Sequence, residues 1–180
     1  MKHNKMDLIA DLINKTQKVI TEVKQLQQLD LEKLNSRKSE SSWSALECIE
    51  HLNRYGAFYI PEIRSVIQHQ PISKIEEFKS GWLGNYFAQS ILPKKKLNKM
   101  STFKSMNPIG SEIDKLIITT FLEQQNQLIE LLERSKDLDL NKIKTSISIS
   151  KLIRLKLGDT FRVVIYHNLR HIEQAKTAVS

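Results

Sequence analysis

Two histidines near the carboxyl end of the chain have a spacing that suits metal binding. His167 and His171 are four residues apart, so on a helix their side chains project from one face, a single turn apart. Two imidazoles make a weak site, and catalytic metal sites generally present three protein ligands and keep a further position open. His51 is the candidate for the third ligand, because it is the only other histidine in the middle of a predicted helix beside apolar residues.

Three polar residues near these histidines could orient an imidazole by bonding to its second ring nitrogen. They are Glu47, one helical turn before His51, and Asn168 and Gln174, which flank the carboxyl-terminal pair. Glu47 has an alternative explanation, because Ser44 and Glu47 have the spacing of a helix capping box. The histidines could also form a buried hydrogen-bonded cluster without metal. No catalytic residue is assigned.

Two segments of the sequence have the form of known motifs. Residues 157–174, LGDTFRVVIYHNLRHIEQ, look like the closing helix of the DinB/YfiT-like family of metalloenzymes, and residues 43–52, WSALECIEHL, are similar to its second-helix signature. The family fold is a four-helix bundle, and one histidine of the second helix and two of the last helix hold the metal. The resemblance implies these roles for His51, His167 and His171. Arg162 and Arg170 also match the pattern, and we expect them to form structural ion pairs rather than substrate contacts.

The same resemblance implies an activity. Characterised relatives are thiol-dependent transferases or isomerases, in which the metal activates a low-molecular-weight thiol. We therefore expect a divalent metal (zinc, nickel, iron or manganese), a thiol cofactor, a small-molecule substrate and a homodimer. A metal-dependent hydrolase and a non-enzymatic helical-bundle protein with a stress or binding role are the alternatives. The chemistry does not need Cys48, which we expect to be a small core residue.

Length and composition favour one helical domain. The chain has 180 residues, which fits a single domain over residues 1–180 with its own hydrophobic core. Only five glycines and four prolines are available to interrupt helices, so an all-α fold is expected. The single cysteine cannot form an internal disulfide, and no segment has the roughly 20 apolar residues that span a bilayer. We therefore expect a cytoplasmic protein with no membrane segment.

The net charge of +8 permits attraction to nucleic acid, anionic lipid or an acidic small molecule. The densest basic cluster lies beside Pro93 and Pro108 and consists of Lys94, Lys95, Lys96, Lys99 and Lys104. Few aromatic residues are interleaved for base stacking, so we expect a solvated loop there and no nucleic-acid partner. The two remaining histidines, His3 and His69, lie near a chain or helix end and are expected on the surface.

Apolar residues recur with a helical period in four long segments, residues 7–29, 44–69, 111–134 and 157–178, and in a short one at 82–92. Residues 30–42, 70–110 and 136–156 are expected to connect them. Residues 146–150 alternate serine and isoleucine like a strand, but we predict an extended loop because no partner strand is evident. The four long segments predict an antiparallel four-helix bundle with long connectors, whose packing must bring His51 to the carboxyl-terminal helix.

Overall fold

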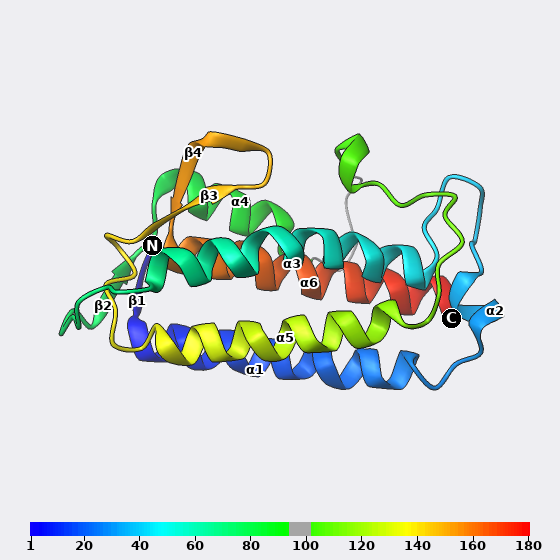
Figure 1. The fold of residues 1–180 in the computed structure, drawn as a ribbon, viewed down its shortest axis with the longest axis horizontal. Coiled ribbons are helices and arrows are strands. Elements are labelled where there is room, and N and C mark those ends of the chain that lie inside the picture. Colours follow the sequence, from blue (N-terminus) through cyan, green and yellow to red (C-terminus); the bar gives the residue numbers. More distant parts are fainter. Residues whose placement is uncertain (94–101) are drawn as a thin grey trace.

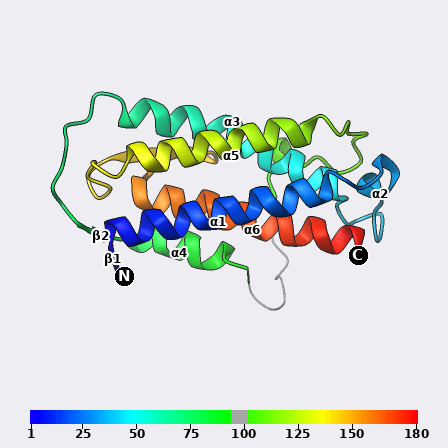
Figure 2. The same cartoon turned by 90° about the horizontal axis from the view of Figure 1, so that it is seen from below.

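In the computed structural model, which describes residues 1–93 and 102–180, four long helices lie side by side (Figures 1 and 2). They are α1 (Lys5–Leu26), α3 (Ala45–Ile67), α5 (Ile117–Arg134) and α6 (Leu157–Val179). Both α1 and α3 pack against α5 and α6. The predicted mainly helical fold is therefore confirmed in the part of the chain that the structure describes.

The directions of the long helices differ from a simple alternation. Figure 1 shows that α1 and α6 run one way and that α3 and α5 run the other way. The contacting pairs α3–α6 and α1–α5 are thus antiparallel, whereas α3–α5 and α1–α6 are parallel. The connectors are long enough to cross the molecule, which allows parallel neighbours. The expectation of an antiparallel arrangement holds for only two of these four contacts.

The long helices begin where the sequence supplies a cap. The side chain of Asn4 accepts hydrogen bonds from the backbone amides of Met6 and Asp7 at the start of α1. At the start of α3, Ser44 and Glu47 form the predicted capping box, with each side chain accepting from the other residue's backbone amide. Helix α3 then continues through Pro61 to Ile67. Because α3 begins at this capping box, His51 lies in the second turn of the helix.

Helix α5 begins later than the sequence predicts. The expected segment, 111–134, started six residues before Ile117 because Ile113 and Leu116 extended the apolar period. Instead, Asp114 forms a turn in which its carboxylate accepts from the backbone amide of Leu116 at 2.7 Å. Ile113 is nevertheless buried in the core. The apolar spacing therefore predicted the burial of Ile113 correctly, but the turn at Asp114 sets the position at which the helix begins.

Two small antiparallel sheets correct the all-α prediction. Strand β1 (Lys2–Asn4) pairs with β2 (Glu77–Lys79), and β3 (Lys144–Ile147) pairs with β4 (Ser150–Lys156) through a short turn. The prediction of a loop at 146–150 was wrong, because the partner strand is the segment that follows immediately. The connectors also contain α2 (Leu31–Asn35), which was not predicted, the predicted short helix α4 (Trp82–Ile91), and a 3-10 turn, η1 (Lys104–Met106).

Both members of a buried ion pair at the start of α6 also bond to α4 or to its cap. Asp159 and Arg162 are each 1% exposed and their side chains lie 3.1 Å apart. The second oxygen of Asp159 accepts from the amide of Gly81 at 2.8 Å, and Arg162 donates to Asn85 at 3.1 Å. A side chain at Gly84 would overlap Asp159, so the helix approaches α6 closely. The structural role predicted for Arg162 is confirmed.

Of the two histidines expected on the surface, one is exposed and one is not. His69 is exposed, but His3 is partly buried with its ring stacked on Phe78, because β1 pairs with β2 and is not a free terminus. Four of the clustered lysines, Lys94, Lys95, Lys96 and Lys99, lie outside the described residues. Among the described helices, none combines the length and apolar character that a membrane crossing requires.

The core consists of two clusters of buried residues that meet near the middle of α3 and α6. Along α3, residues up to Leu52 belong to one cluster and those from Tyr59 onward to the other. Along α6, residues up to Tyr166 belong to the second cluster and Ile172 and Ala175 to the first. Leu169 packs against both. On α6, His167 and His171 lie between the two clusters, and on α3, His51 lies directly before Leu52, at the end of the first cluster.

Candidate metal centre

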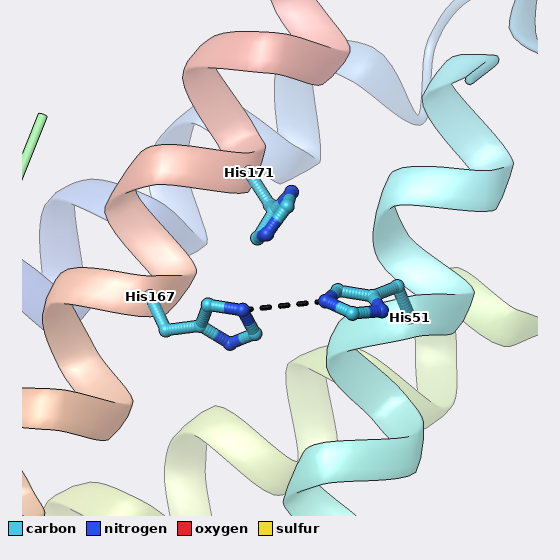
Figure 3. A group of neighbouring side chains, drawn as sticks. All are labelled: His51, His167 and His171. Carbon is cyan, nitrogen blue, oxygen red and sulfur yellow. Dashed lines mark hydrogen bonds between the residues drawn. The ribbon is translucent and has the colours of Figure 1, made fainter. Parts of the chain in front are cut away.

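The structure brings His51, His167 and His171 together between α3 and α6 (Figure 3). The Nε2 atoms of His51 and His167 lie 3.2 Å apart. The candidate ligand atoms of all three rings lie within 4.8 Å of one another. The helical spacing of His167 and His171 explains their part of the cluster, and the contact between the antiparallel helices α3 and α6 supplies His51.

Two of the rings are oriented by hydrogen bonds at Nδ1. The Nδ1 atom of His51 lies 2.6 Å from the backbone carbonyl oxygen of Met106, and Nδ1 of His171 lies 3.0 Å from Oε1 of Gln174. A carbonyl oxygen can only accept, so Nδ1 is the donor in both neutral rings and Nε2 carries the lone pair. The lone pairs that a cation needs are therefore on the atoms that face the cluster.

The loop that supplies the Met106 carbonyl is attached to α3 on both sides of the histidine. The guanidinium of Arg54 donates to the carbonyls of Ser105 and Asn107, at 3.3 Å and 3.4 Å. The amide of Gly110 donates to Glu47 at 2.6 Å. These bonds fix η1 and the residues after it against one face of α3. The sequence does not reveal this contact, since every residue type has a backbone carbonyl and no side-chain pattern marks this one.

Burial keeps the imidazoles neutral. Desolvation lowers the pKa of His51 to about 4, against the opposing effect of the Met106 hydrogen bond. It lowers the pKa of His171 to about 3, with the nearby His51 acting in the same direction. The pKa of His167 is also well below the ordinary value, through desolvation and then through its two histidine neighbours. At neutral pH all three rings are thus uncharged, which cation binding by imidazole requires.

The donor set fits a divalent transition-metal ion. Nitrogen ligands at about 2.0–2.1 Å around a tetrahedral zinc ion are separated from one another by roughly 3.3 Å. The separation of 3.2 Å between His51 and His167 matches this value. The three candidate ligand atoms lie within 4.8 Å of one another, so the most distant pair would have to approach by up to about 1.5 Å. The bonds to Met106 and Gln174 are of the kind that orients metal-binding histidines in other proteins.

The family assignment agrees with this geometry. Residues 13–175 match the DinB superfamily. This chain belongs to the DinB superfamily. The matched range includes all three histidines, and proteins of the DinB family are often metal-binding. Neither the comparison with curated proteins nor that with solved structures gave a match.

Three residues were expected to orient the histidine rings of this DinB-superfamily chain, and only Gln174 forms a hydrogen bond with one of these rings. The carboxylate of Glu47 instead accepts from Arg37 and from the amide of Ser44, in addition to Gly110. The side chain of Asn168 donates to Gln125 at 2.8 Å. Glu47 therefore organises the start of α3, and Asn168 joins α6 to α5. The alternative reading of Glu47 as a capping residue is the one that the structure supports.

Two aromatic rings pack directly against the three clustered histidines. The Trp43 ring lies 4.6 Å from His51 and 5.5 Å from His171, and the Tyr55 ring lies 4.9 Å from His51 and 4.7 Å from His167, measured between centroids. Burial raises the pKa of Tyr55, so its hydroxyl stays protonated. These rings limit the access of water to the side of the cluster that they cover.

The remaining side of the cluster opens into a pocket of about 950 Å³. His167 and His171 line this pocket, whereas His51 is completely buried behind them. Trp43, Tyr55 and Gln174 also line it. A volume of this size is typical of sites for small-molecule ligands. A cation held by the three histidines would therefore be reached from the pocket and not from bulk solvent directly.

Proposed function

We propose that this DinB-superfamily protein is a divalent-metal-dependent enzyme that acts on small molecules, and that it is a thiol-dependent transferase. The observation that supports the proposal best is the convergence of three neutral imidazoles beside a large pocket. Two of these rings have their Nε2 lone pairs fixed by Met106 and Gln174. A purely structural histidine cluster would not need a pocket of this size next to it.

The chemistry that the bound ion supplies is the acidification of a thiol or a water molecule at its open position. The protein's own residues hold the ion and orient its ligands. Because all three ligands are neutral, none of the positive charge of the ion is cancelled by the protein, which favours acidification. Imidazole ligands suit zinc, nickel and iron, and manganese remains a further candidate.

The thiol in this proposal comes from a second molecule and not from the protein. Cys48 is completely buried and is absent from the pocket lining. Burial is the main cause that raises the pKa of the Cys48 thiol, and the charge of Glu47 acts in the same direction. The thiol therefore does not form the reactive thiolate at neutral pH. A low-molecular-weight thiol entering the pocket is therefore the proposed nucleophile.

A metal-dependent hydrolase is the second candidate, because the open position that accepts a thiol also accepts water. The two candidates differ in the nucleophile alone. Incubation of the metal-loaded protein with an electrophilic substrate such as 1-chloro-2,4-dinitrobenzene, with and without a small thiol, separates them. Turnover that depends on the thiol supports transfer. Turnover at the same rate without it supports hydrolysis.

The first test of the proposal is the metal content of protein purified without a histidine tag. We expect one divalent ion per chain in the wild type and its loss in His51→Ala, His167→Ala and His171→Ala. The exposed His69 offers a matched control, and His69→Ala should retain the ion. If the wild type binds no divalent ion even after dialysis against zinc, the enzymatic proposal is wrong and the histidines are a structural cluster.

We also propose that the four long helices are the four-helix bundle of this family, that residues 1–180 form a single domain, and that two chains associate as a homodimer. Contacts among all four helices and the nearly complete match to the family support the first two points. Only the family resemblance supports the homodimer. Sedimentation analysis tests it, and a mass equal to that of one chain would contradict it.

A further inference from the structure

The pocket beside the histidines extends along α3 and α6 toward the β3–β4 hairpin. Along α6, Val163 and Val164 line the pocket, one helical turn before His167. Along α3, Tyr59 lines it two turns after His51. Figure 1 shows the hairpin and α4 near the same ends of these two helices. The pocket therefore continues about 5–12 Å beyond the histidines in the direction of the hairpin.

This part of the pocket, which we call the hairpin end, is apolar. Its apolar lining residues are Tyr59, Phe87, Ile147, Ile149, Leu155 and Val164, and Ser148 of the hairpin turn also lines the pocket. They come from α3, α4, the hairpin and α6, so four separate elements place an apolar side chain here. Such agreement is not expected of an incidental gap between helices. Apolar linings with few polar groups are typical of ligand sites.

The few polar groups at the hairpin end have partners within the protein. The hydroxyl of Tyr59 accepts a hydrogen bond from the amide of Ser148 at 3.3 Å. Within the described part of the chain, Arg170 is the only pocket-lining residue with a formal charge. It follows His167 by three residues on α6, which places it in the direction away from the hairpin. Among the described residues, a charged ligand group would therefore find no counter-charge at the hairpin end.

Exposure of Ile149 supports a ligand contact at this place. Ile149 lies in the hairpin turn, lines the pocket and is 47% exposed, although an isoleucine in that position gains nothing from contact with water. An apolar ligand that occupies the hairpin end would cover part of this surface. Ile147 and Leu155 lie on the paired strands of the hairpin, and both are buried.

We infer that the hairpin end binds an uncharged aliphatic or aromatic group of the substrate while the substrate's reactive group reaches the metal centre. This inference rests on the proposed metal-dependent function. It defines the substrate as an amphipathic small molecule whose apolar part extends from the histidines toward the β3–β4 hairpin. Polar pocket residues such as Asn107 and Gln174 lie with the histidines and are left for the polar part or the thiol.

The test uses straight-chain hydroxamates, which bind a metal ion through their polar end and carry an alkyl chain of chosen length. Protein loaded with cobalt(II) reports binding through its visible absorption. We expect affinity to rise roughly three- to fourfold for each added methylene from acetohydroxamate to octanohydroxamate, until the apolar end is filled. Affinity that stays within twofold across the series would overturn the inference and leave the metal centre intact.

Two variants and a matched control locate the alkyl chain. Ile149→Asp places a charge in the lining, and Phe87→Ala removes an apolar ring from α4. Each should weaken octanohydroxamate about tenfold or more and leave acetohydroxamate within twofold. Leu152→Asp changes a residue of the same hairpin that is 95% exposed and does not line the pocket, so it should alter neither. Equal sensitivity of all three variants would overturn the assignment.

Metal-free protein separates failure of this inference from failure of the proposed function. If the protein does not bind cobalt, the metal-dependent proposal fails, but titration calorimetry with octanohydroxamate still tests the apolar site. Binding that is reduced by Ile149→Asp would support the hairpin end as a binding site by itself. Absence of octanohydroxamate binding would reject it.

Discussion

The Nε2 atoms of His51 and His167 lie 3.2 Å apart, which is a hydrogen-bonding distance across the interface of α3 and α6. Because the carbonyl of Met106 already accepts the Nδ1 hydrogen of His51, the hydrogen shared by the two rings must belong to Nε2 of His167. A metal ion that binds both Nε2 atoms displaces this hydrogen. His167 must then carry its hydrogen on Nδ1.

This relationship predicts a change of tautomer that nitrogen NMR can detect. At pH 7 the metal-free protein should contain His167 with hydrogen on Nε2 and His51 with hydrogen on Nδ1. Addition of zinc should move the hydrogen of His167 to Nδ1 and leave that of His51 in place. A metal-free His167 that already has its hydrogen on Nδ1 would contradict the arrangement described here.

The metal-free protein should lose stability as the pH falls below 6.5. The pKa of His51 is about 4 in the folded protein and near 6.5 in the unfolded chain, so the unfolded chain binds more protons between these values. Stability is therefore complete above pH 6.5 and declines down to about pH 4 for His51 and about pH 3 for His171. For His51 alone, the loss by pH 5 is about 2 kcal/mol.

Urea unfolding at pH 7 and pH 5 measures this loss. His51→Asn removes one of the titrating groups, so the difference in the free energy of unfolding between the two pH values should be smaller than in the wild type. An identical difference in wild type and variant would show that His51 does not titrate in this window.

Gln174 should affect metal affinity without being a ligand. Its Oε1 accepts from Nδ1 of His171, so Gln174→Leu removes the bond that orients this ring. Loss of such a bond typically weakens metal binding 10- to 100-fold. Competition with a zinc-binding dye measures the effect. Gln127→Leu, which removes an exposed hydrogen bond to Arg64 on another helix, is the control and should leave the affinity unchanged.

The ion pair between Asp159 and Arg162 should be important for stability. Arg162→Met leaves the buried carboxylate of Asp159 without its counter-charge, which costs about 3–5 kcal/mol in the free energy of unfolding. Lys136→Met breaks the largely solvent-accessible pair with Glu133 and should cost less than about 1 kcal/mol. Thermal and urea unfolding measure both. Equal effects of the two substitutions would contradict the structural role assigned to Arg162.

Those parts of the fold that depend on nearby residues could be predicted from the sequence. The capping box at Ser44 and Glu47, the common face of His167 and His171, and the bond from Gln174 to His171 all involve residues three or four positions apart. Interactions at this spacing follow from helix geometry alone. His51 was chosen for its position in the middle of a predicted helix beside apolar residues, and the family resemblance supported the choice, because spacing alone does not show which helix packs against α6.

Contacts that join distant segments could not be predicted in the same way. Met106 approaches His51 through its backbone, which leaves no trace in the residue type. Glu47 and Asn168 stand near the histidines in the sequence, yet tertiary packing gives them Arg37 and Gln125 as partners. The hairpin at 144–156 was missed because its second strand was included in a connector, although the alternation at 146–150 was visible.

The three candidate ligands occupy positions 51, 167 and 171, so 116 positions of the sequence separate His51 from His167. Helices α3 and α6 must pack against each other before a cation can be held by all three rings. An ion that binds only the finished arrangement acts on the equilibrium between folded and unfolded chains and on the rate of unfolding. Zinc added after synthesis should therefore prolong the lifetime of the native protein and leave the early steps of its folding unaltered.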